Sequence, residues 1–251
     1  MPAARKNLHL VCAGRYHDFD FVRLELLKLF AEHDHVRVSV APDYRDHEAL
    51  AAADVLVTYT SDVMPENKDT DALEAFLRAG KRWFALHGTN ALLSYEKGRG
   101  WVAPRAQRRF FHMIGSQFIA HPPIQPFAVR PAMDHPLVRD IEPFEADDEI
   151  YLCRFFGEIQ TLMETEFSGR APGFEESDWT DLESVPIMYL HPWEDNEVLY
   201  LNLGHARGHY DMQPLMDWYD DVERGSWKQP AFYELLRRGI RWSLGEQDLS
   251  P

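Results

Sequence analysis

Hydrophobic and polar residues alternate in blocks along the first third of the chain, and the period changes from block to block. The run at 55–59 is apolar apart from one threonine, which is typical of a strand covered on both faces. Over 19–30 and 70–79, apolar residues recur at spacings of three and four, which predicts helices with one buried face. Short apolar or alternating runs predict strands at 8–12, 36–40, 55–59 and 82–86.

The order of these elements predicts the fold class. Strands and helices alternate, with a short helix between the second and third strands, and this alternation is typical of a parallel sheet with helices on both faces. Asp18 stands just before the first helix, where its carboxylate can accept a hydrogen bond from an N-terminal amide. Gly80 follows the helix over 70–79 and is expected to end it in the left-handed conformation. We therefore expect an α/β protein with a mostly parallel central sheet.

The rest of the chain has a less regular pattern, which predicts an elaborated C-terminal half. Pro230 stands where it can open a final helix, and Gly245 where that helix would end. Turn-forming residues at 193–196 separate two apolar runs, and this predicts a hairpin. The other expected elements are a helix within 101–114 after Pro104, strands at 127–130, 149–153 and 161–166, an exposed loop at 169–184, and hairpin strands at 185–190 and 198–202.

Length and charge limit the classes of function. A chain of 251 residues fits one α/β domain spanning 1–251 better than two domains. There are 26 Lys and Arg against 41 Asp and Glu, a formal net charge of −15, which disfavours nucleic acid and anionic membranes as partners. No apolar run is long enough for a membrane span and no signal peptide is evident, so we expect a cytoplasmic location. A neutral small molecule or a metal ion remains compatible with this charge.

Both cysteines, Cys12 and Cys153, lie in apolar, strand-like runs. Cysteine is commonly a small buried apolar residue, so we expect two free thiols in the core. Two cysteines cannot build a disulfide framework, and nothing in the sequence indicates an oxidising compartment.

Polar side chains follow several of the predicted strands. Ligands bind parallel sheets at the carboxyl ends of the strands, so these side chains are expected to converge. His17 follows the first strand, His87 the fourth and His205 the last. His87 precedes Gly88 in a strand-to-turn arrangement that resembles a nucleophile elbow. A histidine there would act as a general base, a metal ligand or a sugar-binding group, or would be a structural histidine in a turn.

Two further histidines and an acidic stretch are candidates for the same site. His121 follows an apolar run, and His209 lies four residues after His205. With that spacing, two imidazoles lie on the same side of the chain only if the segment is helical. The glycines around the pair argue against a regular helix. Glu149 closes the acidic stretch 147–149 and is a candidate base or metal ligand, or part of a solvated acidic turn.

The sequence lacks the common catalytic and phosphate-binding motifs. It contains no P-loop, HExxH, GxSxG or CxxC pattern. The stretch Gly98-Arg99-Gly100 is without the rest of a dinucleotide fingerprint. We therefore expect no nucleotide cofactor.

Short motifs occur along the chain in the order typical of one protein family. They begin with a stretch ending in His17, Asp18 and Phe19, and together they span nearly the whole chain. On these motifs the chain resembles the ThuA-like (trehalose utilisation) proteins. The remaining motifs lie at 84–90, 115–122, 134–137, 147–151 and 200–205.

The resemblance implies a flavodoxin-like, three-layer fold related to the class I glutamine amidotransferases. In those relatives a cysteine occupies the elbow where this chain has His87, and a His-Pro-Glu motif supplies its base where this chain has a motif around His205. Neither Cys12 nor Cys153 stands at the elbow, so glutamine hydrolysis through a thioester is not expected. The family is linked to sugar catabolism, in particular of trehalose and related 3-keto-glycosides.

The first hypothesis is an enzyme that acts on a disaccharide or a 3-keto-glycoside as a hydrolase, lyase or isomerase. A divalent metal ion, with zinc as the first choice, would be held by His87, His121 and His205 and would polarise a sugar oxygen. The catalytic residues would be His87, Glu149 and His205. The residues expected to contact the carbohydrate are His17, Asp18, Asn90, His209 and Tyr210.

The second hypothesis is a non-catalytic sugar-binding or assembly protein that has lost the ancestral nucleophile. A third interpretation keeps only the fold and pairs the strand-end histidines with backbone carbonyls. A stoichiometric metal in the purified protein would favour the first hypothesis over the second. A homodimer is expected because symmetric dimers are the commonest assemblies.

Overall fold

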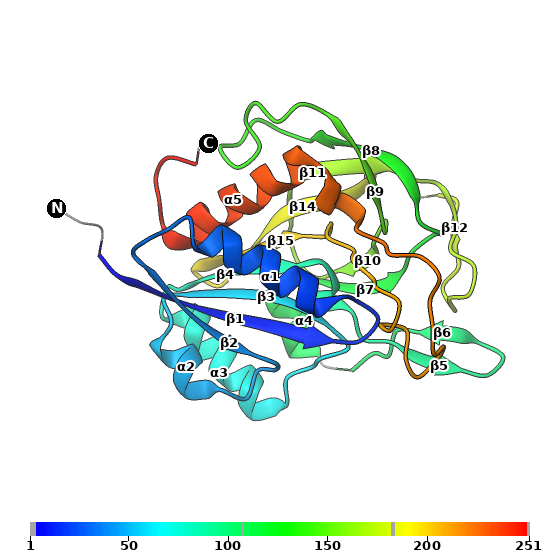
Figure 1. The fold of residues 1–251 in the computed structure, drawn as a ribbon, viewed down its shortest axis with the longest axis horizontal. Helices are drawn as coiled ribbons and strands as arrows, with labels where there is room; N and C mark the ends of the chain where they lie inside the picture. The colour runs from blue at the N-terminus through cyan, green and yellow to red at the C-terminus, as the bar shows by residue number, and fades with distance from the viewer. Residues whose placement is uncertain (1–3, 107, 182–183, 250–251) are drawn as a thin grey trace.

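The structure is a computed structural model that describes residues 4–106, 108–181 and 184–249 (Figure 1). In this part of the chain, nine strands form a mixed sheet in the order β2-β1-β3-β4-β15-β14-β11-β8-β9. The first five strands run parallel to one another, and every pair of neighbours from β15 onward is antiparallel. The strands are β1 (Lys6–Gly14), β2 (Val36–Ala41), β3 (Val55–Ser61), β4 (Arg82–Leu86), β8 (Gln125–Pro131), β9 (Phe144–Asp148), β11 (Gln160–Glu166), β14 (Ser184–Trp193) and β15 (Asn196–Leu201).

Helices cover both faces of the parallel half of the sheet, which gives three layers (Figure 1). On one face, α1 (Phe19–Phe30) and α5 (Pro230–Leu244) bury their apolar residues in one cluster with the sheet. On the other face, α2 (His47–Ala52), α3 (Asn67–Arg78) and α4 (Arg108–Ile114) contribute to a second cluster. All residues of β3 are buried, as expected for a strand between two helical layers. The α/β class and the alternating order of the first half are therefore confirmed.

Within the described residues, shorter strands form three two-stranded sheets outside the nine-stranded sheet. The strand β7 pairs antiparallel with β10, and β5 pairs with β6 as a hairpin. The segments η1 and η2 are single turns of 3₁₀ helix. Their bounds are β5 (Ser94–Glu96), β6 (Gly100–Val102), β7 (Ser116–Ala120), β10 (Leu152–Phe155), β12 (Gly169–Arg170), β13 (Asp178–Trp179), η1 (His87–Asn90) and η2 (Gly225–Lys228).

The residues predicted to begin or end helices lie at helix ends in the structure. Asp18 accepts a hydrogen bond of 3.0 Å from the backbone N–H of Phe21 and caps α1. Gly80, just after α3, has a φ of +76°. Pro230 is the first residue of α5, and Gly245 ends that helix with a φ of +80°. The 3.6-residue period and the cap residues placed both ends of α1 and α5 and the C-terminal end of α3, which begins at Asn67 and not at the expected residue 70.

The stretch 101–114, expected to be helical after Pro104, contains the helix α4 from Arg108 onward. Before Pro104, Gly100–Val102 forms β6 and pairs with Ser94–Glu96, an interaction between segments that helical spacing does not reveal. The loop expected at 169–184 likewise contains the two short paired strands β12 and β13.

The strand expected at 149–153 begins only at Leu152. The preceding strand, β9, ends its pairing with β8 at Asp148, which lies opposite Gln125. Glu149 therefore leaves the sheet between β9 and β10. This break in the pairing frees its side chain to reach the ends of other strands.

Both cysteines are free thiols, as predicted. Cys12 is buried, whereas Cys153 is only partly buried. Burial raises the pKa of each thiol to about 12, so both are protonated near neutral pH. In the described residues, no helix has the length and apolar character needed to cross a membrane.

The direction of the connections reverses at β1, since the chain runs from β1 to β2 on one side and then returns from β2 to β3 on the other side. Such a switch point opens a crevice at the carboxyl ends of the strands. Gly14 ends β1 with a φ of +143°, and a Cβ atom there would lie 2.0 Å from the backbone oxygen of Ser61 at the end of β3. Only glycine permits this approach, which brings the segments that follow β1 and β3 together.

Candidate functional site

Four buried side chains converge at the carboxyl edge of the parallel strands. His17 follows β1, His87 follows β4, Glu149 follows β9 and His205 lies beyond β15. One nitrogen or oxygen atom from each lies within 4.8 Å of the corresponding atoms of the others. We call these four residues the central cluster.

The hydrogen bonds of two histidines fix the direction of their lone pairs. Nδ1 of His17 lies 3.1 Å from the backbone oxygen of Arg15, and Nδ1 of His87 lies 2.8 Å from that of Asn202. A carbonyl oxygen only accepts, so each Nδ1 carries the hydrogen and each Nε2 keeps a lone pair. The two Nε2 atoms are 2.9 Å apart. Two lone pairs at this distance repel unless a proton or a cation lies between them.

His205 has the opposite orientation and reaches the same point. Its Nε2 lies 2.7 Å from a carboxylate oxygen of Glu223, and its Nδ1 lies 3.2 Å from Oε1 of Glu149. Although close to Glu149, this buried Nδ1 has no directed hydrogen bond within the described residues. Burial opposes a charge on His205, but the carboxylates of Glu149 and Glu223 outweigh it and raise the pKa to about 9.

Glu149 is the centre of charge in the cluster. Its Oε2 lies 3.5 Å from Nε2 of His87 and 3.8 Å from Nε2 of His17. Burial alone would raise the pKa of Glu149, but nearby His205 and His121 hold it well below the ordinary value. Burial lowers the pKa of His17 to about 4, so its imidazole is neutral near pH 7. The cluster thus joins an anionic carboxylate to imidazole lone pairs.

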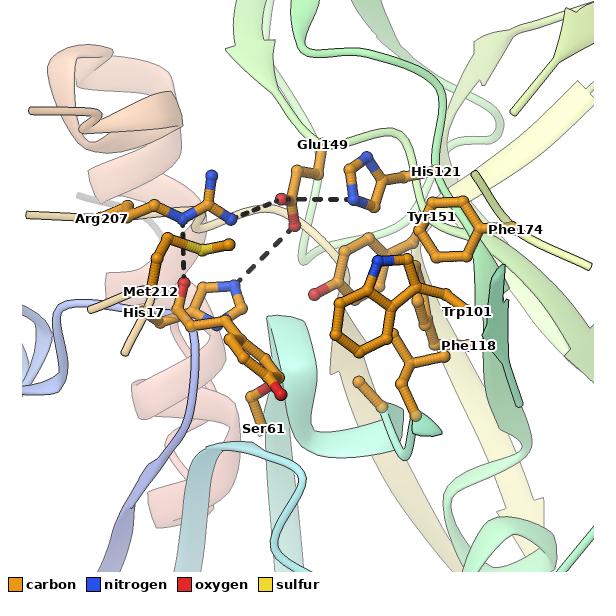
Figure 2. A pocket seen from close by; sticks show the side chains of 13 residues that line it. His17, Ser61, Trp101, Phe118, His121, Glu149, Tyr151, Phe174, Arg207 and Met212 are labelled. Atoms are coloured by element: carbon orange, nitrogen blue, oxygen red, sulfur yellow. Dashed lines mark hydrogen bonds and ion pairs between the residues drawn. The ribbon is translucent and has the colours of Figure 1, made fainter. Parts of the chain in front are cut away.

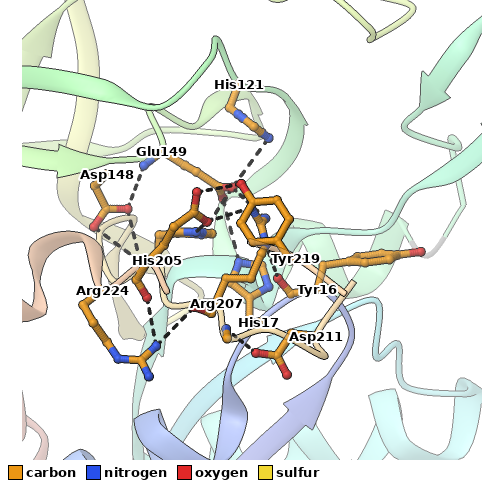
Figure 3. A network of polar contacts seen from close by, with 12 residues as sticks. Tyr16, His17, His121, Asp148, Glu149, His205, Arg207, Asp211, Tyr219 and Arg224 are labelled. Carbon is orange, nitrogen blue, oxygen red and sulfur yellow. Dashed lines mark hydrogen bonds and ion pairs between the residues drawn. The ribbon is translucent and has the colours of Figure 1, made fainter. Parts of the chain in front are cut away.

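Asp148 holds the backbone around two members of the cluster (Figure 3). Its carboxylate accepts hydrogen bonds from the backbone N–H groups of Glu149, Gly204, His205 and Ser226, at distances of 2.8 to 3.1 Å. The side chain is buried. Three segments far apart in the sequence are therefore tied together behind the cluster.

His87 stands in a tight turn supported by tyrosines. Its φ is +43°, which is uncommon for a residue with a side chain. The hydroxyl of Tyr200 donates to the His87 oxygen at 2.7 Å and accepts from the Asn90 N–H at 2.8 Å. The Tyr151 hydroxyl lies 3.1 Å from Nε2 of His87. Tyr200 therefore holds the backbone of the turn, and Tyr151 contacts the imidazole ring.

A pocket of about 110 Å³ opens over the cluster (Figure 2). Polar groups of His17, His121, Glu149, Tyr151 and Arg207 point into it. The other walls are apolar or aromatic and come from several separate segments. They include Tyr16, Leu93, Trp101, Phe118, Phe174 and Met212. Aromatic walls over a polar floor suit a neutral ligand with polar edges and apolar faces.

His121 lies beside the central cluster and outside it. Its Nδ1 is 2.7 Å from the backbone oxygen of Pro122, so in the neutral imidazole the lone pair is on Nε2. The Nε2 atom lies 3.6 Å from Oε1 of Glu149. The side chain of His121 is 26% exposed and lines the pocket. His17, expected to contact substrate, is one of the converging residues and also lines the pocket.

The other residues expected to bind substrate lie around the site at different depths. Asp18 caps α1 and forms an ion pair of 3.0 Å with Arg224. Asn90 is fully buried behind His87, where it donates to Ser116. His209 stacks on Trp218 with ring centroids 4.1 Å apart, and Tyr210 is exposed. The described residues that line the pocket do not include Asp18, Asn90, His209 or Tyr210.

Sequence reasoning missed several residues of the site. Tyr151 and Arg207 lay within or beside the recognised motifs, and their places next to the strand ends were the available signal. Glu223 lies in a stretch without regular period, so no pattern pointed to it. The aromatic walls come from a hairpin and loops that meet only in three dimensions, as in the contact between Trp101 and Gly173.

The donor set fits a divalent cation. Three imidazole nitrogens and one carboxylate are ligands that zinc prefers, and a tetrahedral zinc site separates neighbouring ligand atoms by about 3.3 Å. Within the central cluster the two histidine Nε2 atoms are 2.9 Å apart, and the histidines lie 3.2 Å from one Glu149 oxygen and 3.5 and 3.8 Å from the other. One ligand atom from each of the four residues lies within 4.8 Å of the rest, which makes the set a candidate site for one ion. Each histidine also donates its other N–H to a carbonyl or carboxylate, as ligand histidines usually do.

Comparison with known proteins identifies relatives. Residues 11–219 match the ThuA family, described as trehalose utilisation. No curated protein matches the chain. A solved protein from Bacteroides uniformis ATCC 8492, described as ThuA-like, has 17% identity and a TM-score of 0.68, with 99% of this chain and 94% of that chain covered. Another ThuA-like protein, from Parabacteroides merdae ATCC 43184, has 15% identity and a TM-score of 0.60, with 96% and 91% covered.

One similar structure is part of a larger enzyme. An alpha-L-fucosidase isoenzyme from Paenibacillus thiaminolyticus shares 15% identity with a TM-score of 0.52, and the match covers 98% of this chain but 34% of that one. At these identities the solved structures show a shared fold and no more.

Proposed function

Since this chain belongs to the ThuA (trehalose utilisation) family, we propose that it is an enzyme that acts on a disaccharide or a 3-keto-glycoside. The family connects the chain with carbohydrate use. One observation supports catalysis at this site above all: ring nitrogens of three histidines converge with Glu149 beneath an aromatic pocket. A buried cluster of this kind is costly unless it binds a ligand, because the Nε2 lone pairs of His17 and His87 face one another.

A divalent cation, with zinc as the first choice, would be held by His17, His87, Glu149 and His205. When bound, it would supply Lewis-acid polarisation of a sugar carbonyl or hydroxyl oxygen. This ligand set replaces His121 of the sequence hypothesis with His17, because His17 faces His87 at 2.9 Å.

The chain's own residues would bind the sugar and move the proton. Trp101 and Phe174 offer ring faces and edges that suit the apolar face of a pyranose. His121 is the candidate proton-transfer group, since its Nε2 keeps a lone pair, lies beside Glu149 and is reached from the pocket. Arg207 lies 3.4 Å from Glu149 and would hold that carboxylate in its charged form. The buried surroundings would exclude bulk water from the reacting oxygen.

The test combines metal analysis with turnover of trehalose and of 3-keto-glycosides. We expect about one zinc per chain in the purified protein. His87→Ala and His205→Ala should lose the metal and the turnover and keep the fold. His121→Ala should keep the metal and lose turnover by about 10²–10⁴-fold, the usual contribution of a general acid or base. His35→Ala is the control, because His35 lies before β2, outside the pocket lining.

Wild-type turnover in His87→Ala or His205→Ala would overturn the assignment. The second candidate, a non-catalytic sugar-binding protein, is favoured by the presence of His87 where amidotransferase relatives carry a nucleophile. Sugar binding by calorimetry without turnover of any substrate, in protein without stoichiometric metal, would support that candidate.

A further inference from the structure

We propose that Glu223 is a positioning residue that makes His205 a metal ligand and couples the segment 207–224 to the metal site. This inference rests on the proposed metal-dependent function. It concerns a carboxylate outside the central cluster and a segment that has no regular secondary structure over most of its length.

The segment is a loop whose two ends are joined. Two backbone hydrogen bonds join these ends. The N–H of Arg207 donates to the backbone oxygen of Glu223 at 3.0 Å, and the N–H of Glu223 donates to the backbone oxygen of Arg207 at 2.8 Å. Between these ends most side chains are exposed or half-buried, including Tyr210 and Trp218. Met212 reaches the wall of the pocket. The loop is therefore held mainly at its base, next to the site.

The Glu223 carboxylate is held by three donors at the base of this loop. One oxygen, Oε2, accepts from His205 Nε2 at 2.7 Å and from Arg207 Nη1 at 2.8 Å. The other accepts from the Tyr219 hydroxyl at 2.8 Å. A carboxylate only accepts, so it keeps a hydrogen on Nε2 of His205 and turns Nδ1 toward the other members of the central cluster, where Nδ1 would be the atom that binds a metal.

Glu223 differs from the groups that orient the other two histidines. His17 and His87 donate to neutral backbone carbonyls, of Arg15 and Asn202. Only His205 among the three donates to a carboxylate. A charged acceptor raises the basicity of a ligand imidazole more than a carbonyl does, so Glu223 should contribute strongly to metal affinity.

The same contact links the loop to the metal. If the metal binds better when Glu223 is seated on His205, then by thermodynamic reciprocity the metal also stabilises the seated loop. Since Met212 and Arg207 line the pocket, the loop position then affects the shape of the sugar site. Metal binding and pocket closure would be parts of one equilibrium.

The test measures zinc affinity by chelator competition and backbone hydrogen exchange over 208–222 in the full chain. Glu223→Gln should weaken zinc binding by about 10- to 100-fold, the usual effect of removing such an outer partner. Glu223→Asp should have an intermediate effect, because the shorter side chain keeps the negative charge but holds it farther from His205. Zinc should slow exchange over 208–222 in the wild type and much less in Glu223→Gln. Asp221→Asn is the matched control, since Asp221 is an exposed acidic residue of the same loop.

The outcomes separate this inference from the proposed function. Wild-type zinc affinity in a folded Glu223→Gln variant would overturn the role of Glu223 and leave the metal site standing. A wild-type protein that binds no zinc would overturn the metal site itself. An equal loss of affinity in Asp221→Asn would show a general effect of loop charge and would also contradict the inference. If Glu223→Gln does not fold, the Glu223→Asp variant decides by the same criterion.

Discussion

The side chain of Asp148 is buried and accepts hydrogen bonds from backbone N–H groups on three segments of the chain. One segment contains Glu149, one contains His205, and the third begins η2. None of these backbone groups can turn to water without moving the site. A single carboxylate therefore sets the positions of two members of the central cluster, although it is not itself one of them.

Asp148→Asn should destabilise the protein by about 2–5 kcal/mol. The amide keeps one acceptor oxygen and replaces the other with a donor, which leaves buried N–H groups without an acceptor at about 1–3 kcal/mol each. Urea unfolding followed by circular dichroism measures the difference. Asp147→Asn is the control, because Asp147 is the exposed neighbour on the same strand. Equal stability of the two variants would contradict the role given to Asp148.

The histidines of the site show how far a sequence predicts a function at this scale. His87 and His205 follow predicted strands, so the rule that ligands bind at strand ends was enough to select them. The same rule selected His17 but not its role, because its distance of 2.9 Å from His87 depends on how β1 and β4 are spaced by β3. Glu223 had no signal, since its contact with His205 joins a loop to a strand end.

At the scale of elements, α5 lies against β4, the strand that leads to His87. Gly239 of α5 faces the ring of Phe84, and a Cβ atom at Gly239 would lie 2.3 Å from Phe84 Cε1. Both residues are buried. The glycine therefore permits the helix to approach the sheet at the strand that positions the turn of His87.

Gly239→Ala should destabilise the protein although alanine favours helix. The gain in helix propensity is about 1 kcal/mol, whereas overpacking in a rigid core costs about 1–3 kcal/mol, and the distance of 2.3 Å predicts the upper part of that range. Thermal unfolding should show a lower Tm. Adding Phe84→Leu should recover part of the loss relative to the sum of the single variants. A higher Tm for Gly239→Ala would show that the helix moves at little cost.

Element limits show a similar division between local and distant causes. Both ends of α1 and α5 and the C-terminal end of α3 were placed by period and caps, which are local properties of the chain. The strand β6 was not predicted, because it forms by pairing with β5. The strand expected at 149–153 was shortened because pairing with β8 ends at Asp148. Hydrogen-bond partners in another segment decided both outcomes.

At the scale of the whole molecule, the parallel and antiparallel halves of the sheet share a core. One cluster of buried residues contains Leu10 and Phe84 from the parallel half and Met163 and Val185 from the antiparallel half. The strands β15 and β14 join the halves within one sheet. Neither half can separate without exposing part of this cluster.

We therefore expect a single cooperative unfolding transition, as the prediction of one domain over 1–251 requires. Differential scanning calorimetry should give one peak whose calorimetric enthalpy equals the van't Hoff enthalpy. Excess zinc should move the whole peak to higher temperature, because a ligand of the native state stabilises everything that unfolds with its site. Two peaks, with zinc moving only one, would show that the halves unfold separately.

The sequence by itself determined the α/β class and the order of strands and helices along the first part of the chain. It also determined the strand ends at which polar residues would meet. These properties depend on period and caps, which act over a few residues. The tertiary structure decided which of those residues touch, how Glu149 reaches the parallel strand ends, and that Glu223 orients His205. These contacts join β9, β15 and a loop without regular period. They depend on distances across the fold, and such distances leave no repeating pattern in the chain.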